Sequence, residues 1–186
     1  LEGMTSLVHL DISYNALTDI ADVPNFSNLK ILRASSNNLT ELPPLDGLTG
    51  LEEIDAGNNE LTTTGSINGF NDLHTLILSR NQLTDVSGIR DLPNLLELGL
   101  SNNQITGLGS FSNMNSVKKL ALYNNQVSDL SAVGNLTGLI EALLGSNQIS
   151  DVSPLANNTA LQRLYLGDNQ ITDVSPLQGL TDAIEI

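Results

Sequence analysis

The ten residues SNQISDVSPL at positions 146–155 recur almost unchanged as DNQITDVSPL at positions 168–177, which is 22 residues later. Stepping back from this pair by 22 residues reaches an Asn every time, without an insertion or a deletion. The column has eight members: Asn15, Asn37, Asn59, Asn81, Asn103, Asn125, Asn147 and Asn169. A fixed period through the whole chain indicates stacked structural repeats.

Apolar residues keep the same period. The residues eight, five and three places before each Asn are apolar, and so is the residue two places after it. Each unit therefore reads L-x-x-L-x-L-x-x-N-x-L, and its Asn holds the ninth place. The L-x-L stretch alternates as a strand with one buried face does, so each unit is expected to add one strand to a parallel sheet, about 4.8 Å from the last.

This pattern resembles the leucine-rich repeat across essentially all 186 residues. The segment D-V-S-P-L, at 151–155 and 173–177, resembles the internalin-type repeats of bacterial surface proteins. The intracellular 22-residue class, typified by phosphatase-regulating repeat proteins, is the alternative. The resemblance implies an α/β-type solenoid, a horseshoe or arc with a parallel concave sheet of about eight strands and short 3-10 or irregular convex segments.

The register predicts a single solenoid over residues 1–186, with eight 22-residue repeats and partial repeats at both ends. Leu1 and Met4 fit the late apolar places of a preceding unit, and Ala183 and Ile186 fit the opening places of a ninth. Solenoids need polar caps at their ends, and the sequence offers none. We therefore expect either a fragment of a longer protein that continues in both directions or ends that a partner covers.

The Asn column is interpreted as structural. Where the chain turns inward after each strand, an unpaired buried backbone group costs about 1–3 kcal/mol. Asn carries both a donor and an acceptor, so a column of Asn side chains can bond the turns above and below.

Two predictions concern the convex side. Ser153–Pro154 and Ser175–Pro176 favour short 3-10 turns, with Ser as the N-cap and Pro at the first helical position. Residues 62–70 form the most polar convex segment, and we expect loose packing there.

An acidic residue recurs four places after the Asn in six units: Asp19, Glu41, Asp85, Asp129, Asp151 and Asp173. Such a column could be a calcium-binding rail or a set of carboxylates that accept hydrogen bonds from nearby backbone N–H groups. One carboxylate per turn does not build a site of 6–8 ligands. Weak calcium binding is thus the less favoured hypothesis, and no metal site or cofactor is predicted.

Amino-acid composition and the spacing of the histidines exclude several classes of function. With 21 acidic and 7 basic residues, the chain does not suit nucleic acid or an anionic membrane surface, and no apolar run reaches the roughly 20 residues of a membrane span. The absence of Cys removes disulfides and thiol chemistry. His9 and His74 lie three turns apart, or about 14 Å, so no catalytic residues are predicted and the chain is not expected to be an enzyme.

The variable places of each unit indicate where a ligand could bind. Places two, three, five, seven and eight, which face out on the concave side, hold all three Tyr, both His and six of the seven basic residues. Tyr and Arg often anchor protein interfaces. The candidate ligand-binding residues are Tyr14, Arg33, Arg80, Tyr123, Arg163 and Tyr165, and a merely solvated strand surface is the alternative.

The resemblance implies a protein-binding module of an extracellular or bacterial cell-surface protein, which binds a protein ligand on its concave face and serves adhesion. The alternatives are a cytoplasmic adaptor of the same repeat class, a structural spacer, or the targeting module of a larger enzyme.

Overall fold

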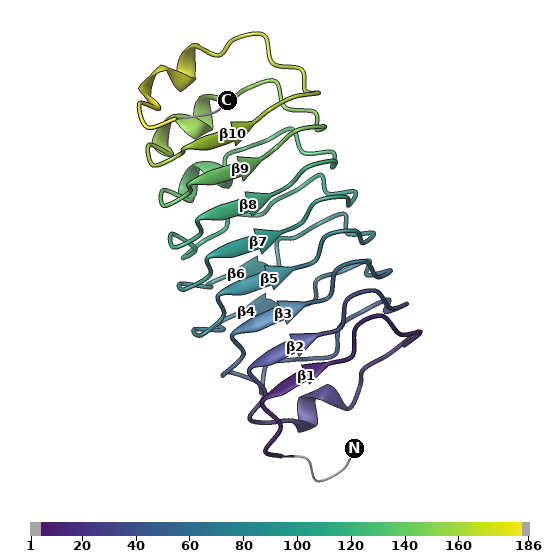
Figure 1. Ribbon diagram of the computed structural model, residues 1–186. Coiled ribbons are helices and arrows are strands. Elements are labelled where there is room, and N and C mark those ends of the chain that lie inside the picture. Colours follow the sequence, from purple (N-terminus) through teal and green to yellow (C-terminus); the bar gives the residue numbers. More distant parts are fainter. Residues whose placement is uncertain (1–4, 184–186) are drawn as a thin grey trace.

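The computed structural model describes residues 5–183 as one solenoid, with a parallel sheet along its concave side and shorter segments behind it (Figure 1). The sheet has eight strands in the order β1-β2-β3-β5-β7-β8-β9-β10. Their bounds are His9–Asp11, Ile31–Arg33, Glu53–Asp55, Thr75–Ile77, Glu97–Gly99, Lys119–Ala121, Glu141–Leu143 and Arg163–Tyr165. The predicted solenoid class is confirmed. Leu1, Met4 and Ile186, which the register assigns to partial repeats, lie outside the described residues.

The strand register reproduces the sequence period. Leu10 pairs with Leu32, and Leu32 pairs with Ile54, so equivalent residues of successive units are neighbours in the sheet. The ladder continues beyond the strands, because the N–H of Ile12 donates to the carbonyl of Arg33 at 2.8 Å. Every place of the repeat therefore forms a column along the solenoid.

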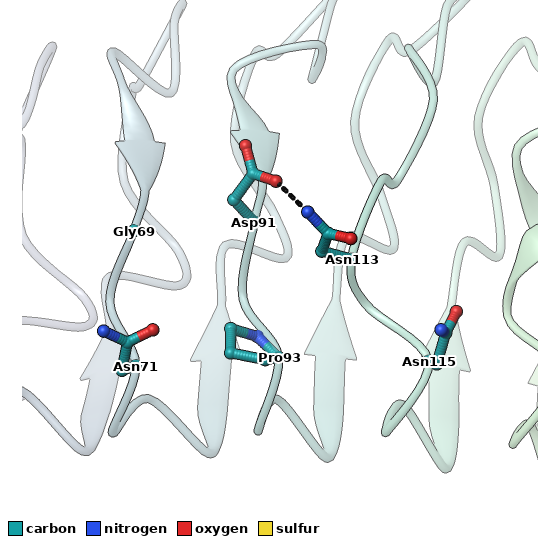
Figure 2. Close-up of a pocket in the computed structure, with 6 residues that line it drawn as sticks. All are labelled: Gly69, Asn71, Asp91, Pro93, Asn113 and Asn115. Atoms are coloured by element: carbon teal, nitrogen blue, oxygen red, sulfur yellow. Dashed lines mark hydrogen bonds between the residues drawn. The ribbon is translucent and has the colours of Figure 1, made fainter.

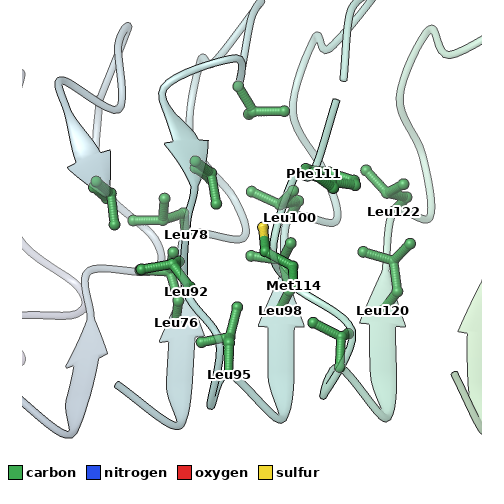
Figure 3. Close-up of a cluster of buried hydrophobic side chains, with 14 of the residues drawn as sticks. Leu76, Leu78, Leu92, Leu95, Leu98, Leu100, Phe111, Met114, Leu120 and Leu122 are labelled. Atoms are coloured by element: carbon green, nitrogen blue, oxygen red, sulfur yellow. The ribbon is translucent and has the colours of Figure 1, made fainter. Parts of the chain in front are cut away.

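The core is a stack of these apolar columns. Figure 3 shows Leu76, Leu98 and Leu120 aligned on successive strands, in one cluster with Phe111 and Met114. The three leucines are fully buried. Burial of one such side chain contributes about 1.5–3 kcal/mol. Because each turn covers the next, stability is shared between neighbouring repeats.

In four of the eight units the convex side has a short 3-10 helix: η1 at Val23–Asn25, η2 at Val133–Asn135, η3 at Ser153–Asn157 and η4 at Ser175–Gly179. The 3-10 turns predicted for the last two repeats are confirmed. The N-cap assignment was wrong, because Val152 is the N-cap of η3 and Ser153 is its first residue. The Ser153 hydroxyl donates instead to Asp151 Oδ2 at 2.9 Å.

The middle of the convex side has a different structure. Strand β4, Ile67–Asn68, pairs in parallel with β6, Ile89–Arg90, and together they make a second, two-stranded sheet. In Figure 1 this pair lies behind β3, β5 and β7. Ile67 and Phe70 are only 2% exposed. The expectation of loose packing in residues 62–70 does not hold for these two side chains.

Among residues 5–183 the structure has no helix that is both long and apolar enough to span a membrane.

Candidate functional site

The Asn column ties each turn to the one before it. The Asn59 side chain donates through Nδ2 to the carbonyls of Ala34 in the preceding turn and Ala56 in its own turn, at 3.0 and 3.1 Å. Its Oδ1 accepts from the N–H of Leu39, also in the preceding turn, at 3.0 Å. We predicted bonds to the turns above and below. From Asn37 to Asn169 each Asn bonds the preceding turn, and the link to the following turn comes from the next Asn.

The acidic column holds the turns that lead into the convex segments. Asp151 and Asp173 each accept a hydrogen bond of 2.8 Å from the backbone N–H two residues later. The hydrogen bonds from Ser131 and Ser175 hold the pKa values of Asp129 and Asp173 below their ordinary value of 3.8. Within residues 5–183, no group of three or more His, Cys, Asp or Glu side chains is placed to hold a metal ion. These contacts are those of turn-stabilising carboxylates.

The concave face, defined by places two, three, five, seven and eight of the units, carries ion pairs between neighbouring turns. Arg33 holds Glu53 with two hydrogen bonds, of 2.7 and 3.1 Å, and these raise the pKa of the guanidinium. Arg163 pairs with Glu141 at 3.3 Å. Two of the predicted anchor residues are therefore engaged with carboxylates of the same face. Two further pairs, Lys30–Glu52 and Lys119–Glu97, have distances of 2.6 and 2.8 Å.

The eighth place of every unit adopts a left-handed backbone conformation. Its φ angles lie between 54° and 60° at Tyr14, Ser36, Asn58, Arg80, Asn102, Asn124, Ser146 and Asp168. Asn and Asp tolerate this region better than Tyr or Arg do. Tyr14 is 84% exposed there. Tyr14 and Arg80 thus project from a backbone position that suits other residue types.

The fifth place divides the concave face into two halves. It holds Asp11, Arg33 and Asp55 in the first three units, and then Ile77, Gly99, Ala121, Leu143 and Tyr165 in the last five. The register places these residues in one continuous column. The first half of the face is therefore charged along this column, and the second half is apolar.

An open depression of about 350 Å³ lies at the end of the apolar column. It is lined by Tyr123, Leu143, Gly145, Tyr165, Gly167 and Asp168. Leu143 and Tyr165 are direct neighbours in the register of β9 and β10. The Tyr123 ring lies over Gly145, since a Cβ built there would be only 3.4 Å from Tyr123 Cδ2. The lining thus combines two tyrosines with a leucine and two glycines.

The structure brings together only part of the predicted set. Tyr123 and Tyr165 line one depression, and Arg163 lies two residues before Tyr165 on β10. Tyr14, Arg33 and Arg80 belong to the first four units and do not line it. The prediction missed Leu143, Gly145, Gly167 and Asp168. The change of the fifth place from charged to apolar residues was the signal that could have identified Leu143.

A second depression, of about 400 Å³, lies on the flank where the chain returns from the convex side to the sheet (Figure 2). Its lining comes from three successive turns: Gly69, Asn71, Asp91, Pro93, Asn113 and Asn115. Asn113 Nδ2 donates to Asp91 Oδ1 at 2.6 Å. The lining contains no aromatic side chain, and none of the predicted ligand-binding residues belongs to it.

Comparison with known proteins agrees with this architecture. The family model described as Leucine Rich repeats (2 copies) matches residues 27–71, 71–113, 93–135 and 137–179, and the model Leucine Rich repeat matches residues 3–20. A search of curated protein sequences gave no significant match.

Solved structures are similar along 98% of the chain. Internalin C2 of Listeria monocytogenes is 35% identical with a TM-score of 0.91, and the alignment covers 81% of it. A leucine-rich repeat protein of Leptospira interrogans is 27% identical, with a TM-score of 0.88 and 48% covered. The functional domain of InlJ from Listeria monocytogenes, which includes a cysteine ladder, is 26% identical, with a TM-score of 0.85 and 39% covered. The chain belongs to the leucine-rich repeat family and is internalin-like within it.

Proposed function

We propose that this chain is the protein-binding module of a bacterial surface or secreted protein, and that it binds its ligand through the concave face. The similarity to internalin C2 supports the module and its bacterial surface setting. We extend the proposal to adhesion on the same ground. No catalytic step, metal or cofactor forms part of this function.

The observation that carries the proposal is the depression between Tyr123 and Tyr165. Tyrosine is enriched at binding hot spots because its ring buries a large area and its hydroxyl tolerates water. Tyr123 is 48% exposed. The core leaves no need for an exposed aromatic side chain at this place, since the other units have Ser or Gly at the seventh place.

Charge supports the same surface. The concave places hold seven acidic and six basic residues, whereas the rest of the chain holds fourteen acidic residues and one basic. The acidic convex side and flanks repel other acidic proteins and favour solubility. The concave face is close to neutral. An acidic protein partner therefore meets the weakest electrostatic repulsion there.

The test is a selection from a displayed peptide library with purified chain as the bait. Binders are compared on wild type, on a variant with Tyr14, Tyr123 and Tyr165 changed to Ala, and on a control with Gln82, Gln104 and Gln126 changed to Ala. The three glutamines are exposed and lie one place beyond the Asn column, outside the concave face. The proposal predicts binders that recognise wild type and control and lose the tyrosine variant. Binders that recognise all three proteins equally would contradict it.

A further inference from the structure

We infer that the depression between Tyr123 and Tyr165 receives an arginine side chain of the protein partner. This inference rests on the proposed function and adds the chemistry of the group that is bound.

The shape and lining of the depression match a long side chain with an aliphatic stem. Leu143, Gly145 and Gly167 line it together with Tyr123 and Tyr165, so most of the lining is apolar or aromatic. An added Cβ at Gly167 would meet no atom within 4 Å, so the space above this residue is open. The methylene groups of arginine cover apolar surface of this kind while their charged head stays accessible.

The charges around the depression favour a cation. Asp168 is the one charged residue among its six lining residues. The neighbouring charged column, at the third place of the units, is internally paired, because Glu97 holds Lys119 and Glu141 holds Arg163. The lining therefore carries one negative charge beside apolar and aromatic residues.

The Asp168 carboxylate is held in place by the preceding turn. Its Oδ2 accepts from Ser146 Oγ at 3.2 Å, and its backbone carbonyl accepts from the N–H of Asn147 at 3.2 Å. A planar guanidinium stacks on tyrosine faces and also binds carboxylates, which the compact ammonium group of lysine does less well. Two tyrosine rings and a fixed carboxylate thus favour arginine over a purely apolar side chain.

The experiment uses fluorine NMR of the chain labelled with 3-fluorotyrosine. The chain has three tyrosines, so Tyr123 and Tyr165 report on the depression and Tyr14 is an internal control. Each resonance is assigned with its Tyr→Phe variant. The probes are N-acetyl-arginine amide and, as the neutral comparison, N-acetyl-norleucine amide.

The inference predicts that the arginine probe shifts the Tyr123 and Tyr165 resonances in a saturable way, leaves that of Tyr14 in place, and acts at lower concentration than the norleucine probe. Asp168→Asn should weaken binding roughly two- to fivefold, as expected for an ion pair of an exposed carboxylate. Gly167→Val should abolish binding by filling the open space, whereas Gly47→Val, which also meets no atom within 4 Å, should leave it unchanged.

Three results would overturn the inference. Equal response to both probes would show an apolar site without charge selectivity. Equal shifts at all three tyrosines would show nonspecific contact. Shifts that follow protein concentration alone would show that a second copy of the chain covers the depression. Each of these results leaves the proposed function open, because concave-face binding of a displayed peptide is read separately.

Discussion

The side-chain amides of Asn59 and Asn81 both donate to the backbone carbonyl of Ala56, at 3.1 and 3.0 Å. Ala56 belongs to the same turn as Asn59, whereas Asn81 belongs to the next turn. The same sharing occurs at the carbonyls of Leu78 and Leu100. The repeated Asn thus joins adjacent turns through main-chain atoms, which explains why it recurs while the residues just before it vary.

Replacing Asn81 by Ala should destabilise the fold. Asn81 Oδ1 accepts from the N–H of Leu61 at 2.9 Å, and Leu61 is fully buried. An unpaired N–H at this position costs about 1–3 kcal/mol. Urea unfolding measures the loss, and Asn15→Ala is the matched control, because Asn15 is exposed and its amide donates, within residues 5–183, only to carbonyls of its own turn. Equal losses for the two variants would contradict the structural role of the column.

Replacing Asn158 by Leu should stabilise the protein. Asn158 is fully buried, and its Oδ1 has no hydrogen-bond partner among residues 5–183. Its Nδ2 donates to the carbonyls of Val133 and Leu136, which also accept from backbone N–H groups. Leu136 and Leu180 hold the same place in the adjacent units. Removal of an unpaired buried acceptor is expected to raise the free energy of unfolding by about 1 kcal/mol, and a clear fall would refute this reading of the site.

Replacing Arg80 by Asn should stabilise the protein. Arg80 has a φ angle of 60°, and Asn occupies the equivalent place in Asn58, Asn102 and Asn124. Because Asn adopts this conformation more readily, the variant should be more stable by up to about 1 kcal/mol. Thermal unfolding checks this, with Asn102→Arg as the reverse change and an opposite expected sign. If neither variant changes the midpoint, the backbone conformation carries no measurable cost.

Stability should fall as the pH drops below about 4. Asp129 and Asp173 have pKa values lowered from 3.8 by hydrogen bonds from Ser131 and Ser175. A carboxylate with a lowered folded-state pKa stabilises the fold above the unfolded-state value, and this contribution disappears as the pH falls through the folded-state value. Urea midpoints measured from pH 5 to pH 2 should show a shallower fall in a variant with both residues changed to Asn. An unchanged slope would mean that these hydrogen bonds do not couple to folding.

Much of the fold could be predicted from the sequence because the repeat has no insertions. A register of 22 residues places Leu10, Leu32 and Ile54 in one column whatever the details of the turns. The Ser-Pro pairs likewise predicted η3 and η4, since Pro fixes φ near the helical value. The position of the N-cap could not be derived, because the hydroxyl of Ser153 bonds to Asp151 and leaves Val152 as the cap.

The candidate site was predictable only in part. The concentration of Tyr and Arg at the outward places indicated the concave face. The pairing of β4 with β6 and the depression at Tyr123 depend on how side chains of neighbouring turns meet. The Tyr123 ring extends over the next turn because that turn has Gly145 at the seventh place. Such contacts between turns cannot be predicted from the repeat pattern of any one unit.

The separation of scaffold and binding positions is tested by a substitution scan of the whole chain that measures folding and binding in parallel, with a concave-face binder from the displayed library as the probe. We expect the substitutions that impair folding to lie in the apolar and Asn columns. Substitutions that weaken binding without lowering the folded fraction should lie at the outward places of the last three units, around Tyr123, Leu143, Tyr165 and Asp168. A cluster of such positions on the convex side, or an even spread over all eight units, would show that the ligand does not bind at the depression.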